Sequence, residues 1–302
     1  MANLWVHRYL LRAGARLNAA SQRKEFPGAL IRTDSGFACL HPWPELGDPS
    51  LEASLRDLAE GRPNPLVRQA LHCAKIDGDA RAKGRSLFEG IAVPRSHATL
   101  PSLDRAQLEN AHQAGFTTVK LKAPDLAHLR DEMKHQNSLC FRLDYNGTAD
   151  LTSLLTEFSE WSMAEKARLD FLEDPVPYQA ETWRKLAREL EIPLANDRSA
   201  ERDQGSDFVI LKPALTRLED FPQSHTRKIV TSYMDHPLGQ SFAAVAAGRA
   251  QITEICGLQT HGLFEKDAFT EQLGPITPDF TAPAGTGLGF DHLLEALPWQ
   301  KL

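Results

Sequence analysis

The chain has 302 residues and a formal net charge of −6 at neutral pH; 42% of its residues are hydrophobic and 25% are charged. This composition is typical of a globular protein, long enough for one large domain or two modest ones, and it excludes disordered and fibrous classes. Acids and bases are mixed along the chain, the N-terminal residues lack the pattern of a signal peptide, and no stretch approaches the roughly 20 apolar residues of a membrane span. We therefore expect a cytoplasmic protein without nucleic-acid or membrane partners, and no feature implies a protein partner.

The first 90 residues alternate strand-like and helical segments. The turn Asp34-Ser35-Gly36 connects two strand-like segments and predicts a small antiparallel sheet. Apolar residues then recur twice at helical spacing. We expect strands at 4–11, 29–32 and 37–40 and helices at 50–60 and 65–83, which together form an α+β unit over residues 1–90.

After Gly90 the pattern changes to strand, loop and helix in repetition. Eight candidate strands with helices between most of them favour a parallel barrel, although an open doubly wound sheet also fits the pattern. The link between Asn196 and Phe208 is short for a helix. The predicted strands are 91–93, 117–122, 139–143, 169–173, 193–196, 208–211, 228–232 and 253–257, and the predicted helices include 103–114, 151–161 and 182–191.

Carboxylates end three consecutive predicted strands. Asp144, Glu173 and Asp197 would meet at one mouth of a barrel, because the carboxyl ends of its strands lie together. Taken alone, Asp144 or Asp197 would be read as a helix cap. Together the three would repel one another, and a divalent cation resolves that repulsion. All-oxygen ligands without histidine or cysteine favour a hard cation, Mg²⁺, for which Mn²⁺ can substitute.

Lysines flank these carboxylates along the chain. Lys120 and Lys122 are two residues apart on one predicted strand, so their side chains share a face, and Lys212 follows a later strand. A lysine needs its pKa lowered by about 3 units to act as a base near neutral pH, which a second lysine and a cation can supply. Alone, this strand would be read as half exposed, with solvated lysines.

Five short motifs resemble the enolase superfamily, in its muconate lactonizing subgroup, and within it the o-succinylbenzoate synthases. Their order and spacing along most of the chain make the resemblance specific, although each motif is short. The motifs are Val119-Lys120-Leu121-Lys122, Arg142-Leu143-Asp144-Tyr145-Asn146, Phe171-Leu172-Glu173-Asp174-Pro175, Asn196-Asp197-Arg198-Ser199 and Ile210-Leu211-Lys212-Pro213.

The resemblance implies an α/β fold, a TIM-type (β/α)7β barrel over residues 91–274. An α+β capping domain over residues 1–90 would cover it, and residues 275–302 would return to that domain. A mobile loop at 16–24 would close over a small-molecule carboxylate substrate.

The resemblance also implies residue roles. Asp144, Glu173 and Asp197 would bind the metal, Lys122 would be the acid and base, and Lys212 would stabilise the developing negative charge from the opposite side. Asp174, one residue beyond a ligand, would point to the other face and support it. The residues expected to bind substrate or support the site are Lys120, Arg142, Asn146, Ser232 and Asp235.

The implied activity is carbon-oxygen lyase chemistry, the dehydration of 2-succinyl-6-hydroxy-2,4-cyclohexadiene-1-carboxylate in menaquinone biosynthesis. Tyr233 and Asp235 stand where such synthases have Ser and Glu. An N-succinylamino acid racemase, or another enzyme of the subgroup, is the alternative, because two lysines on opposite faces can also shuttle a proton. A barrel retained only for binding is a third reading, which the intact charged positions disfavour.

Overall fold

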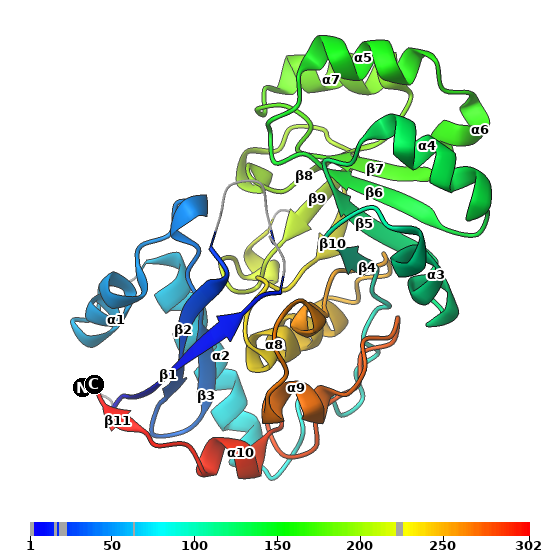
Figure 1. Cartoon of the computed structure of the whole chain (residues 1–302). Coiled ribbons are helices and arrows are strands. Elements are labelled where there is room, and N and C mark those ends of the chain that lie inside the picture. Colours follow the sequence, from blue (N-terminus) through cyan, green and yellow to red (C-terminus); the bar gives the residue numbers. More distant parts are fainter. Residues whose placement is uncertain (1–2, 15–16, 18–22, 63, 222–225) are drawn as a thin grey trace.

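Two sheets organise the protein, seen side by side in Figure 1. The structure is a computed structural model that describes residues 3–14, 17, 23–62, 64–221 and 226–302. One sheet is antiparallel and formed mostly by the N-terminal residues, and the other is parallel and formed by the middle of the chain. No helix in the described ranges is long and apolar enough to cross a membrane.

The antiparallel sheet has the strand order β11-β1-β2-β3. Strand β2 is buried at its centre, where Ala29, Leu30 and Ile31 pack into one core with residues of α1 and α2. Ser50 and Asn64 cap those two helices through their side chains, as short polar residues do at N-termini. The elements are β1 (Trp5–Arg12), β2 (Glu25–Arg32), β3 (Phe37–Leu40), β11 (Gln300–Lys301), η1 (Pro44–Leu46), α1 (Leu51–Ala59) and α2 (Pro65–Arg81).

The end of the chain joins this first sheet. Val6 pairs with Gln300, and the Leu302 amide donates to the Leu4 carbonyl at 2.9 Å. The two termini consequently lie next to each other in Figure 1. Two short helices, α9 (Ala268–Leu273) and α10 (Asp291–Glu295), precede this return.

The parallel sheet has its strands in sequence order, from β4 to β10, and it curls (Figure 1). Parallel neighbours in sequence order need a crossover between them, and helices or short 3-10 turns supply it. The strands are β4 (Ala98–Leu100), β5 (Thr118–Lys122), β6 (Cys140–Asp144), β7 (Leu169–Glu173), β8 (Leu194–Asn196), β9 (Phe208–Leu211) and β10 (Arg227–Val230). The connecting elements are α3 (Arg105–Gln113), α4 (Leu126–His135), α5 (Leu151–Ser159), α6 (Met163–Lys166), α7 (Ala180–Leu190), η2 (Ala200–Arg202) and η3 (Leu218–Asp220). After β10 follow α8 (Pro237–Arg249) and η4 (His261–Leu263).

Side chains alternate between the two faces of this sheet. Val119 and Leu121 lie in the core shared with the surrounding helices, so the lysines between and after them face the inside of the curl. A smaller apolar cluster, which includes Phe171 and Phe208, fills the inside below the polar ends of the strands. The inside of the curl is therefore packed at one end and charged at the other.

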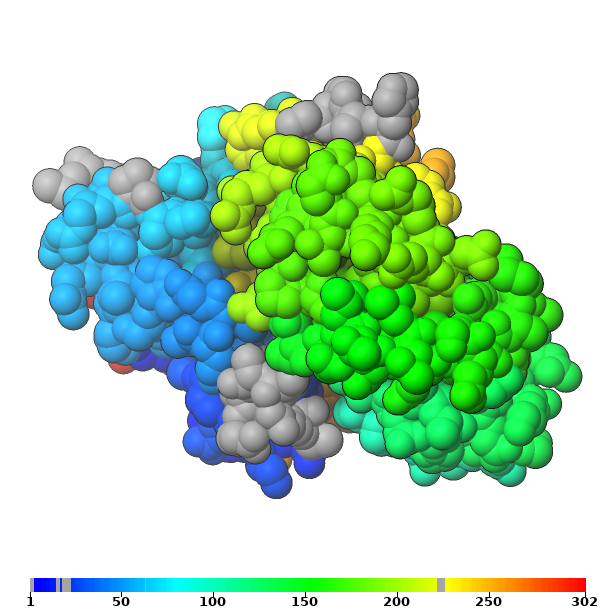
Figure 2. Space-filling model, turned by 90° about the horizontal axis from the view of Figure 1, so that it is seen from above, coloured from blue at the N-terminus to red at the C-terminus, as the bar shows by residue number. Residues whose placement is uncertain are grey.

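Helix α8 lies between the two sheets. Its side chains are buried on almost every side, with Leu238 and Phe242 in the core of the first sheet and Ala244 and Ala247 in the core behind β9 and β10. Figure 2 shows the N-terminal segment, in blue and cyan, packed beside the green and yellow segments. The contact between the two parts of the chain is thus apolar and extensive.

The structure confirms most predicted elements and corrects three. The first strand of the parallel sheet is β4, because residues 91–93 follow the positive-φ residue Gly90 and run into Pro94 without pairing. Residues 253–257 form no strand; Cys256 and Gly257 make only single parallel bridges, to Ser96 and Thr231. The second predicted strand, 29–32, begins earlier, at residue 25. The loop expected at 16–24 falls largely outside the described residues.

Candidate active site

Charged side chains gather at the carboxyl ends of β5 to β9. Parallel register places Lys122 beside Asp144, and Asp144 beside Glu173. Asp197 directly follows β8 and Lys212 directly follows β9. Six charged positions predicted from the sequence therefore meet at one end of the curled sheet: Lys120, Lys122, Asp144, Glu173, Asp197 and Lys212.

Each of the three carboxylates contacts a lysine ammonium. The Nζ of Lys120 lies 2.6 and 2.7 Å from the two Glu173 oxygens and 3.0 Å from Asp144 Oδ2. Lys122 also forms an ion pair with Asp144. Asp197 receives Lys212, whose Nζ lies 2.6 Å from Asp197 Oδ1. The site is thus a network of alternating charges.

Burial makes these charges interact strongly. Burial by itself lowers the pKa of Lys120, but Asp144 and Glu173 outweigh that effect and the net pKa is raised, so Lys120 stays charged. Burial raises the pKa of Asp144, and Lys120 and Lys122 reverse this, leaving it lowered. Burial, followed by repulsion from Asp144, raises the pKa of Glu173 to about 7. At Lys120 the carboxylates therefore outweigh burial, and the lowered lysine pKa expected from a second lysine together with a bound cation stays a prediction.

Asp174 holds the next strand end in place. Its two side-chain oxygens accept from the backbone amides of Asp197, at 3.2 Å, and Arg198, at 3.1 Å. The backbone of Asp174 is left-handed, with φ of 41°, as are Ala123 and Asn146 after β5 and β6. Residues of this kind are strained, and strain gathers at functional sites. The supporting role predicted for Asp174 agrees with these contacts.

The donor set fits a hard divalent cation. Asp144 and Glu173 are buried carboxylates that converge on one ammonium, and Asp197 lies on the next strand end. Within the described part of the chain, no three His, Cys, Asp or Glu side chains are close enough together to form a metal site. Each of the three carboxylates is instead turned toward a lysine.

A pocket of about 530 Å³ opens at this end of the sheet. Asp197 and Lys212 line it from the parallel sheet, and Leu46 and Asp48 line it from the N-terminal unit. Tyr233, after β10, lies between these two sets and is buried. The pocket is therefore built from both parts of the chain, and nothing in the sequence around Asp48 indicated its part in it.

Two predicted residues flank the charged network. Arg142 lies inside the sheet, 1% exposed, where its Nε donates to Asp170 at 2.7 Å and its Nη1 donates to the Ile255 carbonyl at 2.8 Å. Asn146 lines the pocket, and its backbone N–H donates to Asp144 Oδ1 at 3.1 Å. Arg142 therefore supports the floor of the site, and Asn146 supports Asp144.

Two further predicted residues lie on the loop after β10. Ser232 Oγ is 3.1 Å from Thr260 Oγ1, and both side chains are buried. Asp235 is 3% exposed at the start of α8, does not line the pocket, and its Oδ1 has no hydrogen-bond partner. Burial raises the pKa of Asp235 to about 7. Asp235 thus lies near Cys39 of β3, in the seam, by which we mean the contact between the N-terminal unit and the rest of the chain.

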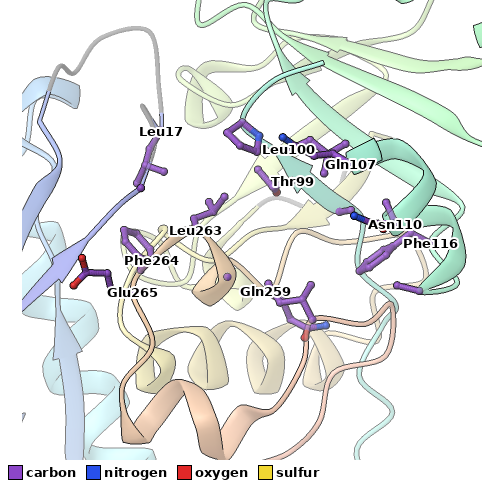
Figure 3. A pocket seen from close by; sticks show the side chains of 17 residues that line it. Leu17, Thr99, Leu100, Gln107, Asn110, Phe116, Gln259, Leu263, Phe264 and Glu265 are labelled. Atoms are coloured by element: carbon purple, nitrogen blue, oxygen red, sulfur yellow. The ribbon is translucent and has the colours of Figure 1, made fainter. Parts of the chain in front are cut away.

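A larger hollow, of about 700 Å³, lies outside the charged network (Figure 3). Gln107 and Asn110 of α3 line one side, and Phe264 and Glu265 after η4 line another. Thr99 on its rim pairs in register with Lys120. Among the described residues that line it, the one charged side chain is Glu265, whereas the smaller pocket is lined by Asp197 and Lys212 of the charged network.

Comparison with known proteins gives the family. Residues 4–80 match the family description "O-succinylbenzoate synthase, N-terminal domain". The o-succinylbenzoate synthase of Bdellovibrio bacteriovorus is 31% identical to the chain over 320 residues, which cover 97% of each protein. The chain belongs to the o-succinylbenzoate synthase family. It is therefore an enzyme of the enolase superfamily, and its class is that of the lyases.

Solved structures show the same fold at low identity. The chain is similar to an N-succinyl Arg/Lys racemase from Bacillus cereus, with a TM-score of 0.78, 15% identity and 100% of each chain covered. A dipeptide epimerase from Cytophaga hutchinsonii, complexed with Mg and a dipeptide, has a TM-score of 0.76, 18% identity and coverage of 100% of this chain and 99% of that one. Members of the o-succinylbenzoate synthase family generally depend on a divalent metal ion.

Proposed function

We propose that the protein is a Mg²⁺-dependent o-succinylbenzoate synthase that dehydrates 2-succinyl-6-hydroxy-2,4-cyclohexadiene-1-carboxylate in menaquinone biosynthesis. The observation that carries the proposal is the paired arrangement of Lys122 with Asp144 and Lys212 with Asp197 at one mouth. Membership of the family supports the choice of reaction.

Asp144, Glu173 and Asp197 would hold the cation. When bound, Mg²⁺ or Mn²⁺ supplies positive charge that orients the substrate carboxylate and makes the neighbouring carbon more acidic. The buried all-oxygen donor set supports this assignment. Asp174 would keep Asp197 in position through the two backbone amides that it accepts.

Lys122 would move the proton. In its neutral form it takes the proton from the carbon next to the carboxylate, and the resulting ammonium then gives a proton to the hydroxyl that leaves as water. One C–H bond and one C–O bond break, and the ring becomes aromatic. A single lysine can serve both steps because both groups leave from the same face.

Lys212 and Lys120 would stay charged. Lys212 reaches the site from β9, which is separated from the β5 strand of Lys122 by three strands, so it can face the opposite side of a bound ring. Its ammonium would stabilise the negative charge that develops on the substrate. Lys120, held by Glu173 and Asp144, would face the substrate carboxylate.

We also propose that the curled sheet is a closed (β/α)7β barrel. The parallel bridges of Cys256 to Ser96 and of Gly257 to Thr231 link its two edge strands and support closure. The barrel would span residues 91–274. Residues 1–90 would form the capping domain together with 275–302, as the pairing of β11 with β1 supports.

Racemisation of N-succinylamino acids is the second candidate function. Two lysines on separate strands, Lys122 and Lys212, could exchange a proton across an α-carbon. The fold of the B. cereus racemase is shared at only 15% identity, so the fold does not separate the two reactions.

An assay of both reactions tests the proposal. The purified enzyme with Mg²⁺ is given the cyclohexadiene substrate, and aromatisation is followed by ultraviolet absorbance; N-succinylamino acids are followed by polarimetry in parallel. We expect a dehydration kcat/KM at least about tenfold above that for racemisation, which corresponds to about 1.4 kcal/mol of transition-state discrimination. Racemisation without dehydration would replace the proposal by the alternative, and turnover of neither would contradict both.

A further inference from the structure

We propose that Tyr233 is a positioning and specificity-determining residue, which anchors the segment 43–48 of the N-terminal unit over the pocket and forms the wall of the pocket beside Lys212. This inference rests on the proposed function only for the identity of the substrate. The contacts that carry it are independent of any substrate.

Tyr233 is bound to the N-terminal unit at both its side chain and its backbone. The Tyr233 hydroxyl donates to Asp48 Oδ2 at 2.9 Å, and the Trp43 indole Nε1 donates to the Tyr233 carbonyl at 2.8 Å. Tyr233 is separated from these two partners by 185 and 190 residues, so the bonds cross from one part of the chain to the other. These two hydrogen bonds at Tyr233 together fix the position and the orientation of segment 43–48 over the pocket.

Asp48 connects the Tyr233 hydroxyl to the backbone of segment 43–48. The carboxylate oxygen that receives the tyrosine hydroxyl also accepts the Trp43 amide at 2.8 Å. The amides of Leu46 and Asp48 in turn donate to the Trp43 carbonyl. Segment 43–48 is therefore a closed turn, and Tyr233 holds it at the carboxylate of Asp48.

The ring of Tyr233 faces the catalytic side of the pocket. The Lys212 Nζ lies 5.7 Å from the ring centroid, on the face that attracts a cation. Tyr233, Lys212 and Asp197 line the same pocket, together with Asp48 from the N-terminal unit. A smaller residue at 233 would enlarge the pocket and would remove the hydroxyl that donates to Asp48. The Tyr233 side chain therefore sets both the width of the pocket and the position of segment 43–48.

Hydrogen exchange tests the anchoring part without any substrate. Tyr233→Phe keeps the ring but removes the donor to Asp48, and we expect the amides of Trp43, Leu46 and Asp48 to exchange about tenfold faster than in the wild type. Tyr9→Phe is the matched control, since its hydroxyl bonds to His41 and Cys39 in the same seam. Unchanged exchange in Tyr233→Phe, or equal acceleration in both variants, would overturn the anchoring.

Binding and turnover test the specificity part. Tyr233→Leu removes the ring and the hydroxyl but keeps an apolar side chain, and calorimetry with o-succinylbenzoate should show about tenfold weaker binding than the wild type. In Tyr233→Phe the KM for the cyclohexadiene should rise several-fold with kcat nearly unchanged, because the hydroxyl touches no reacting atom.

A wider pocket should also relax selection by size. In Tyr233→Leu, the ratio of kcat/KM for the cyclohexadiene to that for a bulky N-succinylamino acid should fall about tenfold. An unchanged ratio with unchanged binding would overturn the specificity role. A wild-type enzyme that turns over neither substrate would contradict the proposed function, while the exchange result would still decide the anchoring.

Discussion

The ammonium of Lys120 is bound by both oxygens of Glu173, at 2.6 and 2.7 Å, although the two residues are 53 positions apart in the sequence. The pair is buried, and removing Lys120 would leave the Glu173 carboxylate without its ammonium partner inside the protein. The strand ends are therefore held together by charge as well as by backbone pairing, and each charged residue of the site depends on its neighbours.

Lys122 carries the proton in the proposed reaction, and its replacement gives the first prediction. Lys122→Ala should lower kcat by about 10⁴-fold, because the proposed reaction moves the proton through Lys122 in both steps. Circular dichroism and thermal unfolding should show a folded protein, since Lys120 still pairs with Asp144. Lys75→Ala, which removes an exposed lysine paired with Asp79, should leave kcat unchanged. Appreciable turnover by Lys122→Ala would exclude that residue as the base.

Metal binding is the second prediction. Activity should vanish on dialysis against a chelator and return with Mg²⁺ or Mn²⁺, and Glu173→Gln should weaken Mg²⁺ binding by at least about tenfold in calorimetry, because it removes one anionic ligand of three. Asp79→Asn, at an exposed carboxylate, is the control and should bind Mg²⁺ as the wild type does. An enzyme that remains fully active after chelation would contradict the proposed ligand set.

The charged site was predictable from the sequence because it depends on two local rules. Successive side chains of a strand point to opposite faces of the sheet, and parallel strands end at a common edge. Lys120, Asp144 and Glu173 could therefore be placed together without knowing any tertiary contact. The helices that cross between strands were predictable for a similar reason, since their apolar residues recur at helical spacing.

Long-range contacts were not predictable in this way. Asp48 lines the pocket and accepts a hydrogen bond from a buried tyrosine 185 residues away, and no local pattern marks such a contact. Residues 253–257 were predicted to form a strand and include the β-branched Thr253 and Ile255, yet only single bridges form there. The pairing of this segment is thus decided by its two neighbours, Ser96 and Thr231, and not by its own sequence.

Arg142 gives the third prediction, which concerns stability. It is 1% exposed and bound to Asp170 and to the Ile255 carbonyl, so Arg142→Met should lower the free energy of unfolding by about 3 kcal/mol by leaving those acceptors without a donor. Arg130→Met breaks the more exposed pair with Glu165 and should cost less than about 1 kcal/mol. Urea unfolding of the two variants measures the difference, and equal losses would contradict the role of Arg142 in the floor.

Two buried histidines in the seam give the fourth prediction. Burial lowers the pKa of His41 and of His236 to about 3, whereas unfolded histidine titrates near 6.5. Between these values the unfolded chain binds more protons, so each histidine's contribution to stability is lost as pH falls through that window. Asp235 acts in the opposite sense, because burial raises its pKa to about 7 and the folded chain then holds more protons between about pH 4 and 7.

Replacing one histidine isolates its share of this pH dependence. His41→Gln should reduce the loss of unfolding free energy between pH 6 and 5 by about 1 kcal/mol relative to the wild type, measured by urea unfolding at each pH. The control is His128→Gln, which replaces an exposed histidine. Equal slopes for wild type and His41→Gln would show that His41 titrates normally in the folded protein.

The crossing of α2 over the turn before β3 gives the last prediction. A Cβ at Gly78, inside α2, would lie 2.7 Å from backbone atoms of Ser35, and one at Gly36 would lie 2.3 Å from the Ala74 carbonyl oxygen. Alanine in place of glycine in a free helix stabilises by up to about 1 kcal/mol, so helix propensity alone predicts that Gly78→Ala is stabilising. The backbone contact reverses that sign, because the turn must move away from the helix, and we expect Gly78→Ala to lower the free energy of unfolding by about 2 kcal/mol.

Gly14→Ala is the control: a Cβ at Gly14 would meet no atom within 4 Å, and the substitution should change the free energy of unfolding by less than about 0.5 kcal/mol. A stabilised Gly78→Ala in urea unfolding would show that the helix and the turn are not in contact in solution.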